Sequence, residues 1–452
     1  MGAYETDVLI AGGGTAGAFV AWKLASIGHK CTVLEKGALA DLGASIGPFH
    51  MEESAFERFA IPLPEAPELL HKITDITTWS PMFKRSFTVR FPICCMDKPL
   101  FHKRLNSYAR DAGAELVEGT EVVGPIIEGG VLRGLRVRGA GGEAEWRARL
   151  VVDASGIEGA VRTKMPYSRW FENDPIADED TIFVYMETWK DAAGDLKPGV
   201  NSFPSFIGWC APGPGDTMIV GVGAGGSPDA ARRRHKEMLE RIPLKGTPVG
   251  SAGGRIPYRR APLSLVDNAL VVVGDAACMN KPFSGEGVTS GFIGCEAAVR
   301  AAAGALSTDD LTRDALWCYN TEYFRGQGAK FAFLTAVLPA MMSLDENEME
   351  YLFELPGLMT EAGALSLQKE FEIAAEPAES LRAVPGILAG LAGGKLRPSS
   401  LASVGRAAAY GSALKAIYSH YPDSPLGFGS WARRARMLWP GAQRAKRLYF
   451  QM

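Results

Sequence analysis

The 452-residue chain has seven cysteines but no Cys-x-x-Cys pair, so the spacing that usually supplies metal ligands is missing. Zinc sites and iron–sulfur clusters are therefore not supported, and we expect no metal ion. The odd number and irregular spacing of the cysteines favour a reducing compartment over a disulfide-bonded secreted protein. Cys94 and Cys95 are adjacent in an apolar run, where we expect buried strand thiols, with redox exchange as the alternative.

The chain also lacks a long apolar run, a secretory signal and an excess of basic residues. Its longest apolar run, 331–342, contains Pro339 and is too short to cross a bilayer. The first residues have no basic start followed by an apolar stretch, so we expect a cytoplasmic protein. The formal net charge is −3, whereas a general nucleic-acid binder is normally basic, so we expect no nucleic-acid partner.

What the chain does contain is a glycine motif at 12–17 that fits Gly-x-Gly-x-x-Gly. A short apolar run at 7–11 predicts a buried strand before the motif, and the segment 15–27 predicts an apolar helix after it. A second strand is predicted at 31–35. Such a β-α-β unit implies a parallel sheet, and the length of the chain favours two or three domains.

Each glycine of this motif has a physical task at a dinucleotide site. Gly12 permits the tight turn, Gly14 lets the backbone approach a pyrophosphate, and Gly17 lets the helix lie close to the strand. The helix then presents the free N–H groups of its first turn, at Thr15 and Ala16, to the anion.

Glu35 closes the second strand, and Lys36 follows it. A carboxylate at this position can accept hydrogen bonds from ribose hydroxyls, and it would repel a 2′-phosphate. NADP is therefore disfavoured at this site.

A second stretch, 221–226, also fits the glycine pattern, after a strand and before a possible helix at 229–240. No clear strand ending in an acid follows, because Lys, Gly and Pro interrupt 244–250. We therefore interpret 221–226 as the edge of a β-sheet. Without a second dinucleotide site, a nicotinamide would bind only transiently, or another electron carrier would serve.

Two further strand ends carry an acid and a glycine. The segment 150–156 ends in Asp153-Ala-Ser-Gly156, and 271–277 contains Gly274-Asp275. The latter continues into Pro-Phe-Ser-Gly-Glu-Gly-Val at 282–288.

Together with the first glycine motif, these segments resemble flavoproteins that include geranylgeranyl reductases and dehydrogenases related to electron-transfer-flavoprotein:quinone oxidoreductase. Those proteins have the group-A flavin hydroxylase-like fold. The likeness covers roughly residues 5–305 and implies FAD as the cofactor.

The resemblance implies roles for several residues. Asp275 would bond the ribityl or pyrophosphate region, and the backbone from Gly285 to Val288 would approach the N1/O2 edge of the flavin. Asp153 and Gly156 would support the strand end near the adenosine and pyrophosphate. Lys98 stands where many members have an Arg that contacts FAD; a plain helix-start lysine is the alternative. The candidate cofactor contacts are Gly12, Gly14, Thr15, Ala16, Gly17, Glu35, Lys36, Lys98, Val122, Asp153, Gly156, Gly274, Asp275, Pro282, Gly285, Gly287 and Val288.

Two residues are candidates for the reaction itself. Trp209 lies in a stretch, 208–213, that is similar to one lining the substrate cavity of the reductases; ordinary packing is the alternative. His50 lies where some isoprenoid reductases carry a catalytic Cys. Its ordinary pKa suits proton donation after hydride addition, and a structural histidine is the alternative.

The expected fold is α/β, or α+β overall. A Rossmann-like FAD-binding domain is interrupted by a mostly antiparallel β substrate domain, and a C-terminal helical region follows. The FAD-binding domain is predicted at 1–80, 96–160 and 265–305. Substrate-domain strands are predicted at 81–95 and the main substrate domain at 161–264, with a helical cap at 306–452.

The resemblance implies an FAD-dependent oxidoreductase of the ene-reductase or dehydrogenase type. It would act on carbon–carbon bonds of an apolar isoprenoid-, quinone- or acyl-like substrate, by hydride transfer at flavin N5. One alternative is a monooxygenase or halogenase acting on an aromatic substrate, although the halogenase motif Gly-Trp-x-Trp-x-Ile-Pro is replaced by Gly-Trp-Cys-Ala-Pro at 208–212. Another is an electron-transfer dehydrogenase that passes electrons to quinone with a separate ferredoxin.

The external electron partner would be a reduced nicotinamide, a ferredoxin or a quinone. Near the C-terminus, basic and aromatic residues alternate in a way that suits contact with anionic lipid, so peripheral membrane contact is one hypothesis. A segment folded back on the body is the other, since Pro440-Gly441 is expected to break a helix there. The residues concerned are Trp431, Arg433, Arg434, Arg436, Met437, Leu438, Trp439, Arg444, Lys446, Arg447, Leu448, Tyr449 and Phe450.

Overall fold

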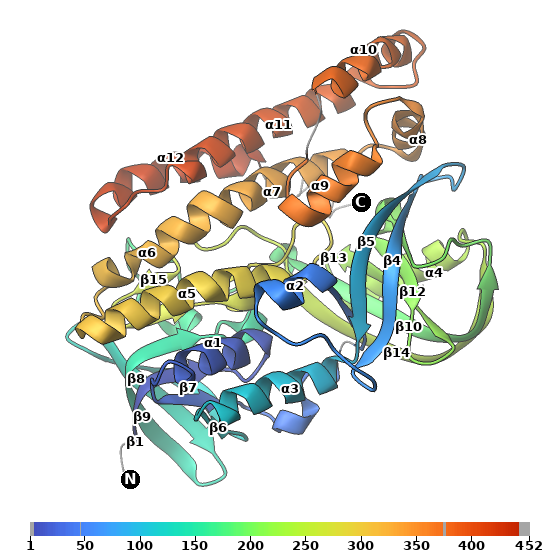
Figure 1. Ribbon diagram of the computed structural model, residues 1–452. Coiled ribbons are helices and arrows are strands. Elements are labelled where there is room, and N and C mark those ends of the chain that lie inside the picture. Colours follow the sequence, from blue (N-terminus) through green and yellow to red (C-terminus); the bar gives the residue numbers. More distant parts are fainter. Residues whose placement is uncertain (1–3, 46, 374–376, 443–452) are drawn as a thin grey trace.

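The structure, a computed structural model, describes residues 4–45, 47–373 and 377–442 (Figure 1). Its first sheet has the strand order β15-β16-β9-β1-β2-β6. The pairs from β16 to β6 are parallel, and the edge strand β15 is antiparallel to β16. The strands are β1 (Tyr4–Ala11), β2 (Cys31–Leu34), β6 (Glu115–Val117), β9 (Gly142–Asp153), β15 (Val266–Asp267) and β16 (Leu270–Val272). The predicted β-α-β unit is confirmed.

Helices cover this sheet because its central strands are apolar on both faces, as parallel strands are when both sides are packed. Val8, Leu9 and Ile10 of β1 are fully buried. Phe19 of α1 stacks on Phe292 of α5, with ring centroids 4.4 Å apart. The covering helices are α1 (Thr15–Ala25), α3 (Lys98–Asp111) and α5 (Val288–Thr308), and β7 (Glu121–Glu128) with β8 (Val131–Gly139) extends β9 as an antiparallel ribbon.

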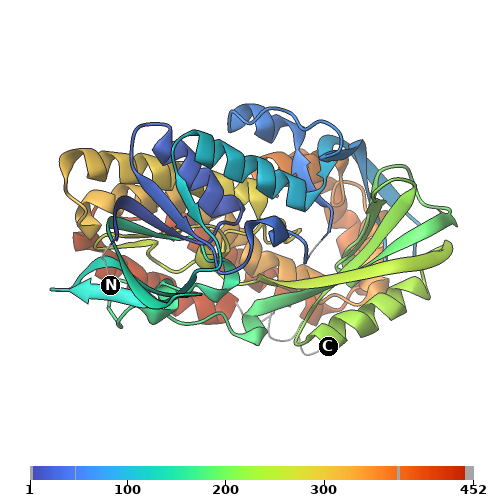
Figure 2. The same cartoon turned by 90° about the horizontal axis from the view of Figure 1, so that it is seen from below.

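The second sheet lies beside the first along the long axis of the molecule (Figure 2). Its order is β14-β10-β13-β12-β11-β4-β5-β3, and neighbours are antiparallel except β4 and β11. The strands are β3 (Phe49–Glu52), β4 (Leu69–Trp79), β5 (Ser86–Met96), β10 (Thr181–Gly194), β11 (Val200–Phe203), β12 (Gly208–Pro212), β13 (Thr217–Gly225) and β14 (Leu244–Pro257). Two strands from the range 1–80, β3 and β4, therefore pair in this sheet. The sheet that β3 and β4 join is decided by backbone pairing with other segments of the chain, which local sequence does not reveal.

The second glycine stretch lies within β13, which pairs with β10 on one side and β12 on the other. A sheet position was predicted correctly, but the edge position was wrong. A side chain at Gly221 would overlap the ring of Trp209 on β12, so this glycine makes room for an aromatic neighbour. The expected break at 244–250 was also wrong, because antiparallel pairing to β10 keeps β14 extended through its Gly and Pro residues.

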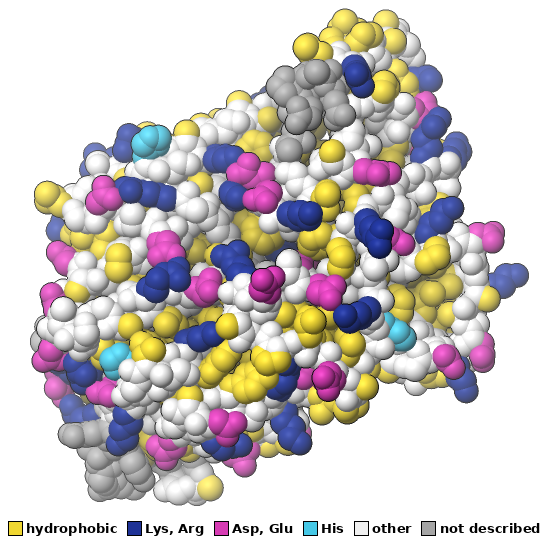
Figure 3. Space-filling view, viewed as in Figure 1, with side chains coloured by type: hydrophobic (Ala, Val, Ile, Leu, Met, Phe, Trp, Pro, Cys, Tyr) yellow, Lys and Arg dark blue, Asp and Glu magenta, His cyan; other side chains and the backbone are white. Residues whose placement is uncertain are grey.

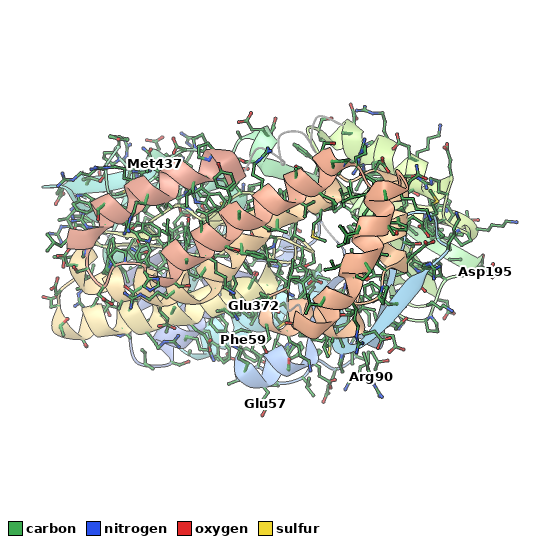
Figure 4. The ribbon with its side chains drawn as sticks, turned by 90° about the horizontal axis from the view of Figure 1, so that it is seen from above. Glu57, Phe59, Arg90, Asp195, Glu372 and Met437 are labelled. Carbon is green, nitrogen blue, oxygen red and sulfur yellow. The ribbon has the colours of Figure 1, made fainter. Side chains whose placement is uncertain are left out.

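The described chain after residue 306 is mostly helical, as predicted. α6 and α7 follow α5, and α10, α11 and α12 lie on one side of the molecule (Figure 1), the side seen from above in Figure 4, where Met437 of α12 is labelled. Glu372 links this region through ion pairs to Lys330 of α7 and Lys415 of α11, at 3.6 and 3.2 Å. The helices are α6 (Arg313–Tyr323), α7 (Ala329–Met342), α8 (Glu346–Glu354), α9 (Glu361–Glu370), α10 (Pro377–Ala392), α11 (Pro398–Ser419) and α12 (Phe428–Ala442), with α2 (Glu53–Arg58) and α4 (Pro228–Leu239) earlier in the chain.

The predicted break at Pro440 is wrong, because α12 continues through it. Packing outweighs the cost of the proline: Trp431 and Trp439 are almost fully buried, and their indole N–H groups donate to Ile417 O and to the Tyr418 hydroxyl. The described part of the predicted basic-aromatic segment thus turns its tryptophans inward, and residues 444–450 lie outside the described residues. Within the described ranges, no helix is both long and apolar enough to cross a membrane.

Candidate functional site

The glycine loop after β1 makes an open cradle at the start of α1. Gly12 has φ +99°, and a Cβ there would lie 2.5 Å from Ala154 O, while a Cβ at Gly17 would overlap Gly12 O. These two glycines are required by the fold itself. A Cβ at Gly14 would meet no atom within 4 Å, so this position borders open space. The N–H groups of the first turn, which starts at Thr15, are therefore accessible to an anion.

Glu35 is buried next to this loop and holds it by two hydrogen bonds. Its Oε2 accepts from Gly13 N at 2.8 Å and its Oε1 from Gly37 N at 3.0 Å. A carboxylate oxygen accepts more than one bond, so capacity remains for a ribose hydroxyl. Lys36 is exposed, whereas Val122 on β7 is buried and its carbonyl accepts from Lys164 Nζ at 3.3 Å.

Asp153 is fully buried and organises the loop after β9. Its Oδ1 accepts from the Ser155 N–H and hydroxyl at 3.2 and 2.5 Å, and its Oδ2 accepts from the N–H groups of Val161 and Arg162 at 3.2 and 2.6 Å. Since both oxygens are engaged, the carboxylate supports the strand end beside Gly12 rather than offering itself to a ligand. Gly156, with φ +71°, borders open space.

Asp275 lies in the turn after β16 and Lys98 at the start of α3, and each influences the charge of the other. Burial raises the pKa of Asp275, and the Lys98 ammonium opposes that rise. Burial lowers the pKa of Lys98, and the Asp275 carboxylate opposes that change. The two groups are therefore close enough to stabilise each other's charge. The fold thus brings together two residues that are 177 positions apart and that the sequence predicts as cofactor contacts.

Glycines also shape the start of α5. Gly285 has φ +74°, and a side chain there would overlap Ile256 of β14. A Cβ at Gly287 would lie 2.8 Å from Asn280 Nδ2 and 3.2 Å from Asp275 Oδ1. Only a glycine backbone fits between these groups. Val288 then opens α5, whose positive end lies beside Asp275.

Buried polar atoms without a hydrogen-bond partner, in the described part of the chain, occur on the elements around this cradle. They include both ring nitrogens of His102, Oδ1 of Asn106 and Oδ1 of Asn280. Each such atom costs about 1–3 kcal/mol when left unsatisfied. Asn106 donates to Gly13 O at 3.2 Å, which places it at the glycine loop. A molecule with polar atoms along its length, such as a flavin dinucleotide, fits this set.

Sequence reasoning did not single out His102 or Asn106. They lie four residues apart on α3, so they share the helix face that turns toward the glycine loop. Burial, together with the nearby Lys98 charge, lowers the pKa of His102 to about 4. The ring is therefore neutral, with one donor and one acceptor. The four-residue spacing could have predicted that His102 and Asn106 share one face of a helix. The sequence does not show whether that face points inward.

Lys281, Glu52 and Glu286 form a buried charged cluster that the sequence did not reveal either. Lys281 is 1 % exposed, and its ammonium donates to Glu52 and, at 3.0 Å, to Glu286 Oε2. The Thr289 hydroxyl donates to the other oxygen of Glu52. The cluster ties β3 of the second sheet to the turn before α5.

His50 on β3 lies beside this cluster, and its Nε2 is buried without a partner among the described residues. Burial lowers the pKa of His50. Glu286 opposes the change and Lys281 adds to it. Trp209 lies against Gly221 of β13, and its catalytic role stays a prediction. Cys94 and Cys95 are buried, as expected of strand thiols, and burial raises the pKa of Cys95 to about 12.

Known proteins resemble this chain in sequence. The chain is 26% identical over 442 residues to a digeranylgeranylglycerophospholipid reductase of Sulfolobus acidocaldarius, covering 94% of this chain and 96% of that protein. The chain resembles geranylgeranyl reductases along nearly its whole length. It is also 28% identical over 316 residues to a geranylgeranyl diphosphate reductase of Rhodobacter capsulatus, covering 67% of this chain and 76% of that one. No family model matches the chain.

Solved structures show the same fold. A geranylgeranyl bacteriochlorophyll reductase-like protein of Thermoplasma acidophilum superposes with a TM-score of 0.72 at 18% identity, over 87% of this chain and all of that one. The myxobacterial FAD-dependent halogenase CndH superposes with a TM-score of 0.58 at 18% identity, over 92% of this chain and 97% of that one. The expected fold class and the reductase-like oxidoreductase type are confirmed, and these relatives imply a flavin cofactor. The halogenase likeness concerns the fold alone.

Proposed function

We propose that this protein binds FAD and reduces carbon–carbon double bonds of an isoprenoid lipid. The names of the curated relatives support the substrate class, because they are reductases of geranylgeranyl lipids or of geranylgeranyl diphosphate. The observation that carries the proposal is that open space at Gly14 and the close-fitting backbone at Gly287 occur with buried polar atoms on neighbouring elements that have no partner among the described residues.

Different residues around the glycine loop would contact different parts of the cofactor. Gly14 and the first turn of α1 would hold the pyrophosphate, and Glu35 would accept from the adenosine ribose. Lys98 and Asp275 would bond the polar chain between pyrophosphate and ring. Gly287 and the start of α5 would lie against the ring edge where negative charge gathers on reduction. Bound FAD supplies the hydride chemistry at N5.

Reduction of a double bond also requires a proton. When a hydride adds to one carbon of an alkene, its neighbour becomes electron-rich and must take up a proton. His50 is the candidate donor, since its Nε2 is buried without a partner among the described residues; burial lowers its pKa, and the Glu286 carboxylate opposes that change and favours the protonated ring. The Glu286 carboxylate, whose side chain is 37% exposed, would be the group that passes protons from solvent to the imidazole.

The neighbourhood of Pro282 is apolar and aromatic on one side, as an isoprenoid chain requires. A small cavity of about 20 Å³ lies between Pro282 and the C-terminal helices. Phe331, Tyr323, Tyr418 and Trp439 line it, with Arg259 and Arg260 at its polar end.

The proposal is tested by identifying the cofactor and then the product. Denaturation of the purified protein should release FAD in a ratio near one per chain. The holoprotein is then given geranylgeranyl lipids with NADH, NADPH, reduced ferredoxin or dithionite as alternative donors. Products heavier by two hydrogens per double bond support a reductase. Unchanged lipids with every donor would reject it, and a product carrying an oxygen atom would favour the monooxygenase alternative.

A further inference from the structure

The lysine cluster, formed by Lys281, Glu52 and Glu286, carries one unbalanced negative charge. The Lys281 ammonium donates to Glu52 and, at 3.0 Å, to Glu286 Oε2. Burial would raise the pKa of Glu286, but the Lys281 ammonium lowers it. Hydroxyl groups add hydrogen bonds and no charge: Thr289 donates to Glu52, and Ser284 donates to Glu286 at 3.1 Å. Two carboxylates share one cation, so the cluster has a net charge of −1.

His50 is the titratable group next to this charge. It lies on β3, two residues before Glu52, and its Nε2 is buried without a hydrogen-bond partner among the described residues. Burial lowers the pKa of His50, the Glu286 carboxylate opposes that change, and the Lys281 ammonium adds to it. With a pKa below its ordinary value, the ring is mostly neutral at neutral pH. A neutral imidazole is a poor acid, so the ring must gain a proton before it can act as the proposed proton donor.

In the described part of the chain, the other groups near His50 are neutral or solvent-exposed. β5 places Cys95 opposite His50, with Cys94 next to Cys95, and burial raises the pKa of both thiols, so they stay protonated. Glu53, the first residue of α2, pairs with Lys72 at 3.1 Å, and both side chains are exposed. Charges of both signs are interspersed on the face of the molecule seen in Figure 3, where water and salt screen them. The buried charge next to His50 is therefore that of the lysine cluster.

The lysine cluster is next in sequence to the backbone proposed to border the flavin ring. Glu286 stands between Gly285 and Gly287, and a Cβ at Gly287 would lie 3.2 Å from Asp275 Oδ1. In the proposed function, the ring edge that gains negative charge on reduction lies against Gly287. Reduction would therefore place a second negative charge beside one that has no counter-ion. Nearby negative charges raise the proton affinity of a basic group, and they do so more strongly where water is excluded.

We propose that His50 takes up a proton at Nε2 when the bound flavin is reduced. The position of the flavin in this inference rests on the proposed function, whereas the identity of the lipid does not enter it. Reduction then stores two electrons and one proton on the flavin and a second proton, taken from solvent, on His50. A double bond that receives a hydride from N5 and the proton from His50 gains two hydrogens, and the flavin and the histidine both return to their starting states. His50 thus holds an acidic proton only when a hydride is present to accompany it.

A proton that binds more tightly after reduction also makes reduction easier at low pH, because the two equilibria are linked. Each proton taken up with two electrons steepens the pH dependence of the midpoint potential by about 30 mV per pH unit. The test is a redox titration of the FAD-loaded full chain, without lipid, between about pH 5.5 and about pH 8, which brackets the ordinary pKa of histidine. Proton uptake on reduction is measured on the same samples with an indicator dye.

His50→Asn is the variant, because asparagine is similar in size and does not titrate. The matched control is His420→Asn, which removes an exposed histidine at the C-terminal end of α11. We expect wild type and control to show a slope about 30 mV per pH unit steeper than His50→Asn near neutral pH. They should also take up about one more proton per reduced flavin. Equal slopes in wild type and His50→Asn would overturn the proposal, even if the protein reduces lipid.

Glu286→Gln tests the role of the lysine cluster at a second, partly exposed position. Glutamine keeps an oxygen that can accept from Lys281 and removes one negative charge, so the cluster becomes neutral. The midpoint potential at neutral pH should rise, and the proton uptake assigned to His50 should shift to lower pH. An unchanged potential and unchanged uptake would contradict the coupling to the cluster. A purified chain that holds no FAD would instead overturn the proposed function, and this inference with it, before any titration begins.

Discussion

Lys281 forms an ion pair with Glu52 although 229 residues separate them. Glu52 ends β3 in the second sheet, and Lys281 lies in the turn that leads to α5 on the first. The same ammonium also binds Glu286, so one buried cation is shared by two carboxylates, of which Glu52 is buried and Glu286 is partly exposed. This cluster fixes the position of β3, and therefore of His50, relative to the start of α5.

Replacement of Lys281 should destabilise the folded protein, because Glu52 and Glu286 would lose the cation that they share. Lys281→Met is expected to lower the free energy of unfolding by about 3–5 kcal/mol. The matched control is Arg300→Met, which breaks an ion pair with Glu322 whose side chains are 58% and 49% exposed. That change should cost within about 1 kcal/mol. Urea unfolding of both variants measures the difference, and equal losses would contradict the structural role of the buried cluster.

Gly14 and Gly17 should respond differently to alanine. Gly14→Ala adds a methyl group to open space, so the protein should fold normally but bind FAD about tenfold or more weakly, because the methyl group occupies the pyrophosphate position. Gly17→Ala forces a clash with Gly12 O and should prevent stable folding. Thermal unfolding of the apoprotein and a fluorescence titration with FAD separate the two effects. Normal FAD affinity in Gly14→Ala would place the pyrophosphate elsewhere.

Glu172 is expected to make the stability of the folded protein depend on pH in the acid range. Burial alone would raise its pKa, but Arg260, bonded to both carboxylate oxygens at 2.7 and 3.0 Å, lowers it to about 2. The folded pKa thus lies below the unfolded value of 4.5. The stabilisation is therefore complete above pH 4.5 and is lost as pH falls toward the folded pKa.

We expect the stability advantage of wild type over Glu172→Gln to shrink by about 2 kcal/mol between about pH 6 and pH 3. Urea unfolding of both proteins at the two pH values gives this difference, and it cancels the other acid effects on the chain. Glu322→Gln, at an exposed ion pair, should show a much smaller change. A constant difference between wild type and Glu172→Gln would contradict the lowered pKa.

His50 should affect the chemical step more than binding. His50→Ala is expected to lower kcat by about a hundredfold with little change in KM, because a proton donor acts in the transition state. The FAD absorbance spectrum should stay the same. His50→Asn, which is closer in size, should not restore the rate. A variant with wild-type kcat would assign His50 a structural role, which is the alternative from the sequence.

The local parts of the site are predictable from sequence because their signals are local. The glycines at 12–17 and 285–287, with Glu35 and Asp275, each lie in a short motif with its own backbone requirement. The pairing of Lys281 with Glu52 is not predictable in this way, since nothing near either residue specifies the other. Pro440 shows the same limit, because buried tryptophans outweigh its local preference.

Strand pairing is the other part that local patterns miss. β14 carries Gly and Pro yet stays extended, because β10 pairs with it along most of its length. β3 and β4 join the second sheet although they precede the residues predicted for it. In both cases the deciding hydrogen bonds come from segments far along the chain.

The central claim is tested most directly by an anaerobic single turnover. The FAD-loaded protein is reduced, excess reductant is removed, and one equivalent of geranylgeranyl lipid is added without oxygen. Lipid that gains two hydrogens as the oxidised flavin absorbance returns, at equal molar amounts, is the predicted result. A flavin that stays reduced beside unchanged lipid, and reoxidises only when oxygen is admitted, would contradict the account.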